Sequence, residues 1–166
     1  MSGARRVRAV RAQERGWLTE HLQLAWGSTT IVSRGRARDA SLLPAIVCTD
    51  GEELLGLATF EIADGACELV TIEAFRRGEG IGTALLDAVL EQARERGCSH
   101  LHLVTTNDNL AAQRFYERYG LTLVAVHQGA VDEARRLKPE IPLLSEAGIA
   151  IHDELEMELR LEDGAS

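Results

Sequence analysis

The spacing of apolar and polar residues divides the chain into short strands and amphipathic helices. Alternation of apolar and arginine side chains in 7–11 predicts a half-exposed strand. Apolar residues recur at helical spacing in three segments, which we predict to be helices: 13–26, 82–96 and 109–119. Apolar or β-branched runs bounded by turn residues predict strands at 29–33, 45–49, 54–62, 67–72, 100–105, 121–126 and 155–161.

The turn residues between these segments indicate how the strands are connected. Asp50-Gly51 and Asp64-Gly65 lie between apolar runs, which is typical of tight hairpins. The polar stretch 35–41 is predicted to be a loop. Antiparallel hairpins therefore come first and a β-α-β unit follows, which predicts a mixed α/β sheet in a single domain covering 1–166.

Composition narrows the class of protein. The net charge of −8 argues against nucleic-acid binding and favours a cationic substrate. Cys48, Cys67 and Cys98 are widely spaced in apolar surroundings, which predicts buried free thiols in a reducing compartment. No run is long enough to cross a membrane and no secretory signal is visible, so we expect a cytoplasmic protein.

The segment from Arg77 to Thr83 carries the first chemical signal. It reads Arg-Gly-Glu-Gly-Ile-Gly-Thr and joins a predicted strand to a predicted helix. Such a turn exposes backbone N–H groups at the positive end of a helix, where an anion binds well. The glycine spacing does not fit the Rossmann fingerprint, and the lysine of a P-loop is missing.

The second signal is the helix from Asn109 to Tyr119, closed by Gly120. Taken alone, Phe115, Tyr116 and Tyr119 at helical spacing indicate simple packing. Together and in this order, however, the two segments resemble the signatures of the GNAT superfamily of acyl-CoA-dependent N-acyltransferases. The departures are Ala74, where proline is common, and Leu121, where phenylalanine is usual.

The resemblance implies a GNAT-like, mostly antiparallel mixed sheet flanked by helices. Before the last strand the sequence adds a helix-and-proline element that standard members lack, and in this segment the chain resembles a bacterial GNAT subgroup without an assigned substrate. It implies acetyl-CoA as co-substrate, with the loop amides on the pyrophosphate, Asn109 on the pantetheine arm and Tyr116 protonating the departing thiolate. Direct transfer to a primary amine of a small molecule or peptide follows. The residues it assigns to the cofactor are Val70, Thr71, Ile72, Arg77, Gly78, Glu79, Gly80, Ile81, Gly82, Thr83, Asn109, Ala112, Phe115 and Tyr116.

Amine acylation also needs a group that takes up a proton. Glu68 and Glu73 lie on the strand before the loop, and strand alternation puts Glu68 on the face of Val70 and Ile72. Some family members carry their base on this strand, at the place that Glu68 matches best. A solvated carboxylate and a water chain are the alternatives. The backbone near 70–72 is expected to donate an N–H to the thioester oxygen.

Several features stay open. His100 and His102 share a strand face, but no third ligand is near, so we expect no metal. Segment 129–148, with a short helix at 131–137 before Pro139, either lines the acceptor pocket or forms a structural arm or dimer contact. The last strand is suited to a sheet edge in a possible homodimer. Two alternative functions remain. The chain could use another donor such as succinyl-CoA, or it could be a non-catalytic acyl-CoA-binding or interaction module.

Overall fold

The computed structural model describes residues 5–162, and its elements follow the predicted order. Within that range the helices are α1 (Arg15–Trp26), α2 (Ile81–Glu95), α3 (Leu110–Tyr119) and α4 (Ala130–Leu137). The strands of the main sheet are β1 (Arg5–Ala9), β4 (Ala45–Asp50), β5 (Glu53–Ala63), β6 (Ala66–Ala74), β7 (His100–Thr106), β8 (Thr122–His127) and β9 (Glu154–Arg160). None of the described helices is both long and apolar enough to span a membrane.

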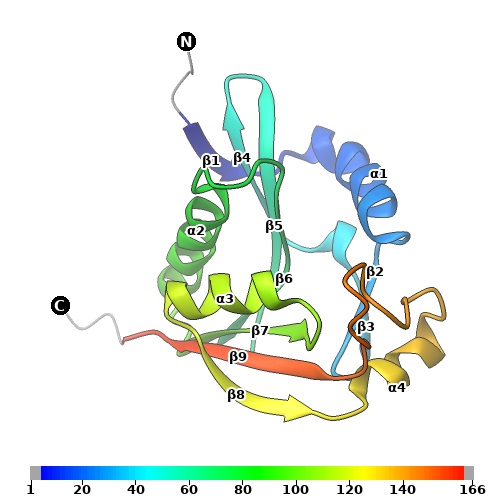
Figure 1. Cartoon of the computed structure of the whole chain (residues 1–166). Coiled ribbons are helices and arrows are strands. Elements are labelled where there is room, and N and C mark those ends of the chain that lie inside the picture. The colour runs from blue at the N-terminus through cyan, green and yellow to red at the C-terminus, as the bar shows by residue number, and fades with distance from the viewer. Residues whose placement is uncertain (1–4, 163–166) are drawn as a thin grey trace.

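The sheet has the order β1-β4-β5-β6-β7-β9-β8, and β6 and β7 are its parallel pair (Figure 1). The remaining neighbours are antiparallel, which confirms the predicted mixed sheet. Both predicted hairpins form. Asp64-Gly65 is the turn between β5 and β6, whereas the turn between β4 and β5 is Gly51-Glu52, one residue later than predicted, because Asp50 still pairs with Glu53. The prediction for the last strand was wrong: β9 lies inside the sheet, and β8 forms the edge because the segment after it folds back between β7 and β8.

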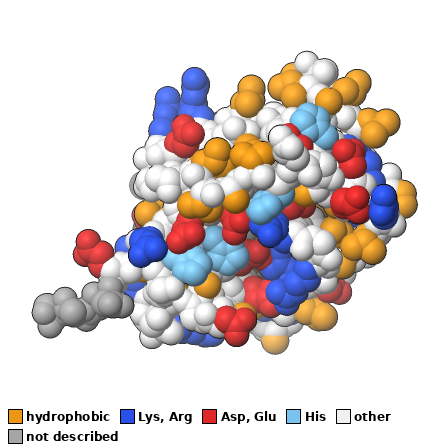
Figure 2. All heavy atoms as spheres, turned by 90° about the horizontal axis from the view of Figure 1, so that it is seen from below, with side chains coloured by type: hydrophobic (Ala, Val, Ile, Leu, Met, Phe, Trp, Pro, Cys, Tyr) orange, Lys and Arg blue, Asp and Glu red, His pale blue; other side chains and the backbone are white. Residues whose placement is uncertain are grey.

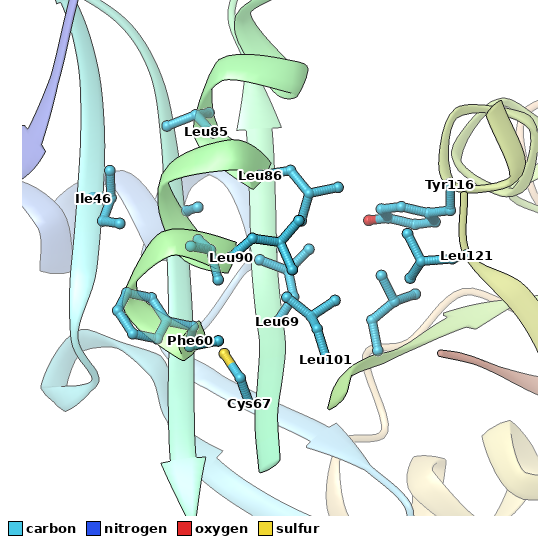
Figure 3. Close-up of a cluster of buried hydrophobic side chains, with 14 of the residues drawn as sticks. Ile46, Phe60, Cys67, Leu69, Leu85, Leu86, Leu90, Leu101, Tyr116 and Leu121 are labelled. Carbon is cyan, nitrogen blue, oxygen red and sulfur yellow. The ribbon is translucent and has the colours of Figure 1, made fainter. Parts of the chain in front are cut away.

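Two apolar clusters lie on opposite faces of the sheet. The face covered by α2 and α3, here called the α2 side, holds the larger cluster, which includes Leu86, Leu101 and Leu121 (Figure 3). The opposite face, here called the hairpin side, carries a smaller cluster in which Leu18 and Leu22 of α1 pack on Val47 and Leu57. Each fully buried leucine contributes roughly 1.5–3 kcal/mol. All three cysteines are buried and free, as predicted.

Gly56 lets α2 lie close to the sheet. A Cβ at this position would come within 2.7 Å of Ile81 Cγ2 and 2.8 Å of the Glu73 carbonyl oxygen. Real Cβ atoms do not approach other atoms so closely, so any larger residue would push the start of α2 away from β5. The position of the glycine-rich turn therefore depends on this glycine in the neighbouring strand.

The hairpin side is covered by an element that the sequence did not predict. Residues expected to form a polar loop instead form β3 (Arg36–Asp39), which pairs with β2 (Thr30–Ser33) in a separate hairpin. Helix α4 packs against β2, and the Lys138 ammonium donates a hydrogen bond to the Thr30 carbonyl at 2.9 Å. Segment 129–148, which contains α4 and Lys138, thus braces the β2–β3 hairpin that covers this face of the sheet.

Candidate active site

Strands β6 and β7 separate in the middle of the sheet. Their pairing runs from Ala66 opposite His100 to Leu69 opposite Leu103 and then stops, although both strands continue. Beyond that point the β7-facing backbone groups of β6 have no strand partner within residues 5–162. The gap between the strands is therefore lined by the backbone of 70–72, which is the stretch predicted to hold the thioester.

A β-bulge at Val70 changes which side chains share a face. Thr59 pairs with Thr71 and Phe60 pairs with Leu69, so Val70 is an extra residue in β6. A bulge reverses the alternation beyond it. The prediction that Glu68 shares a face with Ile72 was therefore wrong. Glu68 and Thr71 lie on the hairpin side, whereas Leu69 and Ile72 lie on the α2 side.

The glycine-rich turn adopts the backbone conformation that glycine favours. Gly78 and Gly80 have φ values of +73° and +74°, and Gly80 precedes α2 without a side chain that caps the helix. The first N–H groups of a helix have no partner within it. The amides of Ile81, Gly82 and Thr83 are therefore directed out of the helix start, as an anion-binding turn requires.

Gly82 brings α3 against the start of α2. A Cβ on Gly82 would lie 3.2 Å from Phe115 Cζ, so the aromatic ring rests directly on this glycine. Phe115 also meets the Tyr116 ring at a centroid distance of 5.4 Å. The structure shows Phe115 in contact with α2, the helix that follows the glycine-rich turn. The assignment of Phe115 to the cofactor stays a prediction.

Tyr116 projects from α3 into the α2 side of the core, close to Leu86 and Leu121 (Figure 3). Its side chain is 7% exposed, and burial raises the pKa of Tyr116 to about 12. The phenol is thus protonated at neutral pH. Among the described residues its hydroxyl has no recorded hydrogen-bond partner, so the proton remains available to a ligand.

Asn109 begins α3. Its side-chain oxygen accepts a hydrogen bond from the Ala112 amide at 3.2 Å, which is the interaction of a helix N-cap. The NH₂ group of Asn109 and the second lone pair of its side-chain oxygen are then left for a ligand. The predicted contact with pantetheine is compatible with this arrangement.

Three other predicted residues have their side chains occupied. The Thr71 hydroxyl shares a 2.6 Å hydrogen bond with Thr59 in the interior, and the Ile81 side chain lies in the larger core cluster. Glu79 forms an ion pair with Arg5, which approaches the turn from β1. These residues can serve a ligand through their backbone groups, and neither Arg5 nor its contact was visible in the sequence.

The hairpin side of the site is charged. Arg38 of β3 is 7% exposed at its side chain and contacts Glu61 at 2.9 Å, and it also forms an ion pair with Glu68. The neighbouring Arg36 binds Glu61 at 2.8 Å. Figure 2 shows histidine, acidic and basic side chains gathered in the middle of the molecular face seen from below. Sequence patterning missed this cluster because Arg38 was assigned to a loop.

Glu73 has a partner that spacing did not suggest. Its Oε2 lies 2.8 Å from His21 Nε2 of α1, and the His21 ring stacks on Trp17 at a centroid distance of 5.4 Å. Phe75 contacts the same imidazole at 5.1 Å. This pair ties α1 to the end of β6, beside the glycine-rich turn.

Two of the three cysteines are poor nucleophiles. Burial raises the pKa of the Cys67 thiol to about 12 and also raises the pKa of Cys48. At these two positions the thiolate, which is the reactive form, is therefore disfavoured. Direct transfer stays a prediction.

Comparisons with known proteins agree with this geometry. The model of the acetyltransferase (GNAT) family matches residues 9–121. The uncharacterized protein YdhI of Bacillus subtilis is 39% identical over 139 residues, which cover 83% of this chain and 87% of YdhI. Streptothricin acetyltransferase of Streptomyces lavendulae is 32% identical over 110 residues, 64% of this chain and 53% of that protein. A GNAT family acetyltransferase from Elizabethkingia anophelis with acetyl-CoA bound superposes with a TM-score of 0.68 at 15% identity, over 95% of this chain and 98% of that one.

Proposed function

Because this chain belongs to the GNAT acetyltransferase family, we propose that it transfers an acetyl group from acetyl-CoA directly to a primary amine. The acceptor is a small molecule or a peptide. The observation that carries the proposal is the divergence of β6 and β7 after Leu69 and Leu103, which share one core cluster with Tyr116. It leaves a stretch of β6 backbone without a strand partner among the described residues, on a sheet whose α2 side also carries a proton donor, as a bound thioester needs.

The backbone would hold most of acetyl-CoA. The uncapped start of α2 offers amides to the pyrophosphate, and the Arg77 guanidinium adds charge at the same turn. The pantetheine arm would run along 70–72, where an N–H reaches the thioester oxygen, and the Asn109 NH₂ group would bind the arm from the other side. Donors of this kind contribute about 3–4 kcal/mol in comparable acyl transfers.

Tyr116 would supply the proton that the leaving thiolate takes up. An ordinary thiol has a pKa of about 8.5, below the value near 12 that burial gives Tyr116. Burial also raises the pKa of a thiol that enters the same pocket, which narrows the difference. The phenol therefore stabilises the departing sulfur by hydrogen bonding and proton donation, worth about 10²-fold in rate.

The acceptor amine would approach from the hairpin side. Glu68 lies on that face two residues before the bulge, whereas Tyr116 lies on the α2 side. Proton removal and thiolate protonation are thus separated by the sheet. We assign the removal of the amine proton to the group of side chains around Glu68, with the carboxylate acting directly or through a neighbouring group.

Two further points belong to the proposal. Three buried free thiols support a cytoplasmic location, where thiols stay reduced. The β8 edge carries three half-exposed apolar side chains, Leu123, Val124 and Val126, and this edge supports a homodimer.

Calorimetric titration with acetyl-CoA tests the cofactor. We expect one-site binding that weakens markedly when the pyrophosphate is removed from the ligand, and weaker binding of succinyl-CoA. The activity is then tested with streptothricin, spermidine and a lysine-containing peptide as acceptors. The release of the free thiol of CoA is measured in each case. Tight binding without transfer to any amine would favour a binding module, and absent binding would refute the proposal.

A further inference from the structure

His102 lies beside Glu68 at the point where the strands separate. The two residues are paired in the parallel register of β6 and β7, one position before the last pair. Both project to the hairpin side, because their neighbours Leu69, Leu101 and Leu103 belong to the core of the α2 side. His102 Nδ1 is 3.8 Å from Glu68 Oε1, and the imidazole is 25% exposed. A group that enters the gap from the hairpin side therefore meets this imidazole.

The Glu68 carboxylate is already engaged by a buried cation. Arg38 forms an ion pair with its Oε2, and that oxygen is fully buried without a hydrogen bond among the described residues. Arg38 is held in turn by Glu61 at 2.9 Å and donates to the Ser33 hydroxyl at 2.9 Å. The carboxylate is therefore fixed by the Arg38 cluster rather than free to approach a substrate.

His102 has the opposite electrostatic setting. The groups that face it are Glu68 on β6, Arg38 on β3, His100 on β7, and Glu156 and Glu158 on β9. Burial, followed by the influence of His100 and Arg38, lowers the pKa of His102, and the two β9 carboxylates act against this. The imidazole is therefore neutral at neutral pH and keeps a free lone pair.

We propose that His102 accepts the proton from the acceptor amine and that Glu68 is the positioning residue that orients its ring. This inference rests on the proposed acetyltransferase function. The carboxylate faces Nδ1 and so favours the proton on that nitrogen, which leaves the Nε2 lone pair for the substrate. A shift of under an ångström, or a bridging water, completes the hydrogen bond between Nδ1 and Glu68.

The protons balance across the reaction. An acceptor ammonium loses two protons as it becomes an amide. The attacking nitrogen forms the C–N bond, the C–S bond breaks, and Tyr116 protonates the thiolate. One proton from nitrogen passes through His102 to solvent, and the other restores the Tyr116 hydroxyl. The Arg38 charge helps, because a nearby cation favours the neutral form of a bound amine.

Replacement of His102 by asparagine tests the inference, with His100→Asn as the matched control on the same face. We measure kcat/KM for acetyl transfer across pH 5–9, using the best acceptor among streptothricin, spermidine and the lysine peptide. The wild type should lose activity as pH falls below the ordinary imidazole value near 6.5. His102→Asn should lose about 10²-fold at neutral pH and lack that acidic limb. Acetyl-CoA affinity should be unchanged in both variants.

Glu68→Gln separates positioning from proton transfer. Without the carboxylate the imidazolium is less stabilised, so the acidic limb should persist but move to lower pH. Nitrogen-detected NMR titration of the five histidines, which needs no acceptor, should show the same downward shift for His102 alone. A His102→Asn variant as active as His100→Asn, or a His102 titration that does not move in Glu68→Gln, would overturn the inference. Failure of the wild type to acetylate any amine would instead overturn the proposed function.

Discussion

The two faces of the central sheet differ in how they are built. On the α2 side the proposed cofactor site consists of backbone groups that glycines expose, resting on a continuous apolar core. On the hairpin side the proposed acceptor site consists of charged side chains from β3, β5 and β6 and of an imidazole from β7. Backbone recognition suits a ligand that is the same throughout a family. Side-chain recognition suits an acceptor that varies, because single substitutions alter it without disturbing the core.

The largest expected effect is on the hairpin side. Arg38→Met removes the cation from a buried cluster and leaves Glu61 and Glu68 facing each other, which should lower the free energy of unfolding by about 3–5 kcal/mol. Urea denaturation measures this. Arg36→Met is the control, because Arg36 also binds Glu61 but is 61% exposed at its side chain, and its loss should cost under about 1 kcal/mol. Equal losses in the two variants would mean that burial of Arg38 does not matter.

A smaller effect, confined to catalysis, is expected on the α2 side. Tyr116→Phe should reduce turnover about 10²-fold while acetyl-CoA affinity and melting temperature change little, because only the proton donor is removed. Tyr119→Phe is the matched control. Its hydroxyl donates to Asp87 of α2 rather than pointing into the core. Turnover unchanged in Tyr116→Phe would exclude the acid role.

The smallest effect is expected at the contact between Gly82 and Phe115, which holds α3 against the glycine-rich turn. Gly82→Ala places a methyl group 3.2 Å from the Phe115 ring and should shift α3 by a few tenths of an ångström. We expect a loss of about 1 kcal/mol in stability and a few-fold weaker binding of acetyl-CoA in calorimetry. Gly16→Ala, where no atom lies within 4 Å, should instead stabilise α1 by about 0.5–1 kcal/mol. A Gly82→Ala variant with unchanged affinity would separate the Phe115 contact from cofactor binding.

The two faces of the sheet also differ in how well their structure can be predicted from the sequence. The elements that build the α2 side are encoded locally. The residue types at Asp50-Gly51, at Asp64-Gly65 and in the turn after Arg77 predict turns there, and helical spacing predicts α2 and α3. The hairpin side depends on contacts between distant segments. A single inserted residue at Val70 reversed the faces of β6, and no local pattern reports a bulge.

Side chains that act far from their place in the chain were missed for the same reason. Arg38 reaches Glu68 across thirty positions, from a stretch whose polar composition resembles a loop. His102 was visible only as one of two histidines two residues apart. Its meaning depends on the parallel register with Glu68, which pairing in three dimensions determines. The roles of the predicted site residues stay predictions that the variants above test.

The bracing contact of Lys138 has a chemical consequence. This is the only lysine in the chain, and its ammonium is held by the Thr30 carbonyl at 9% exposure. A protein proposed to handle an activated acetyl thioester thus keeps its one side-chain amine out of reach of that reagent. Acetyl-CoA at high concentration, or an amine-reactive dye, should leave Lys138 of the folded chain unmodified, and labelling of this side chain should begin only when the hairpin detaches.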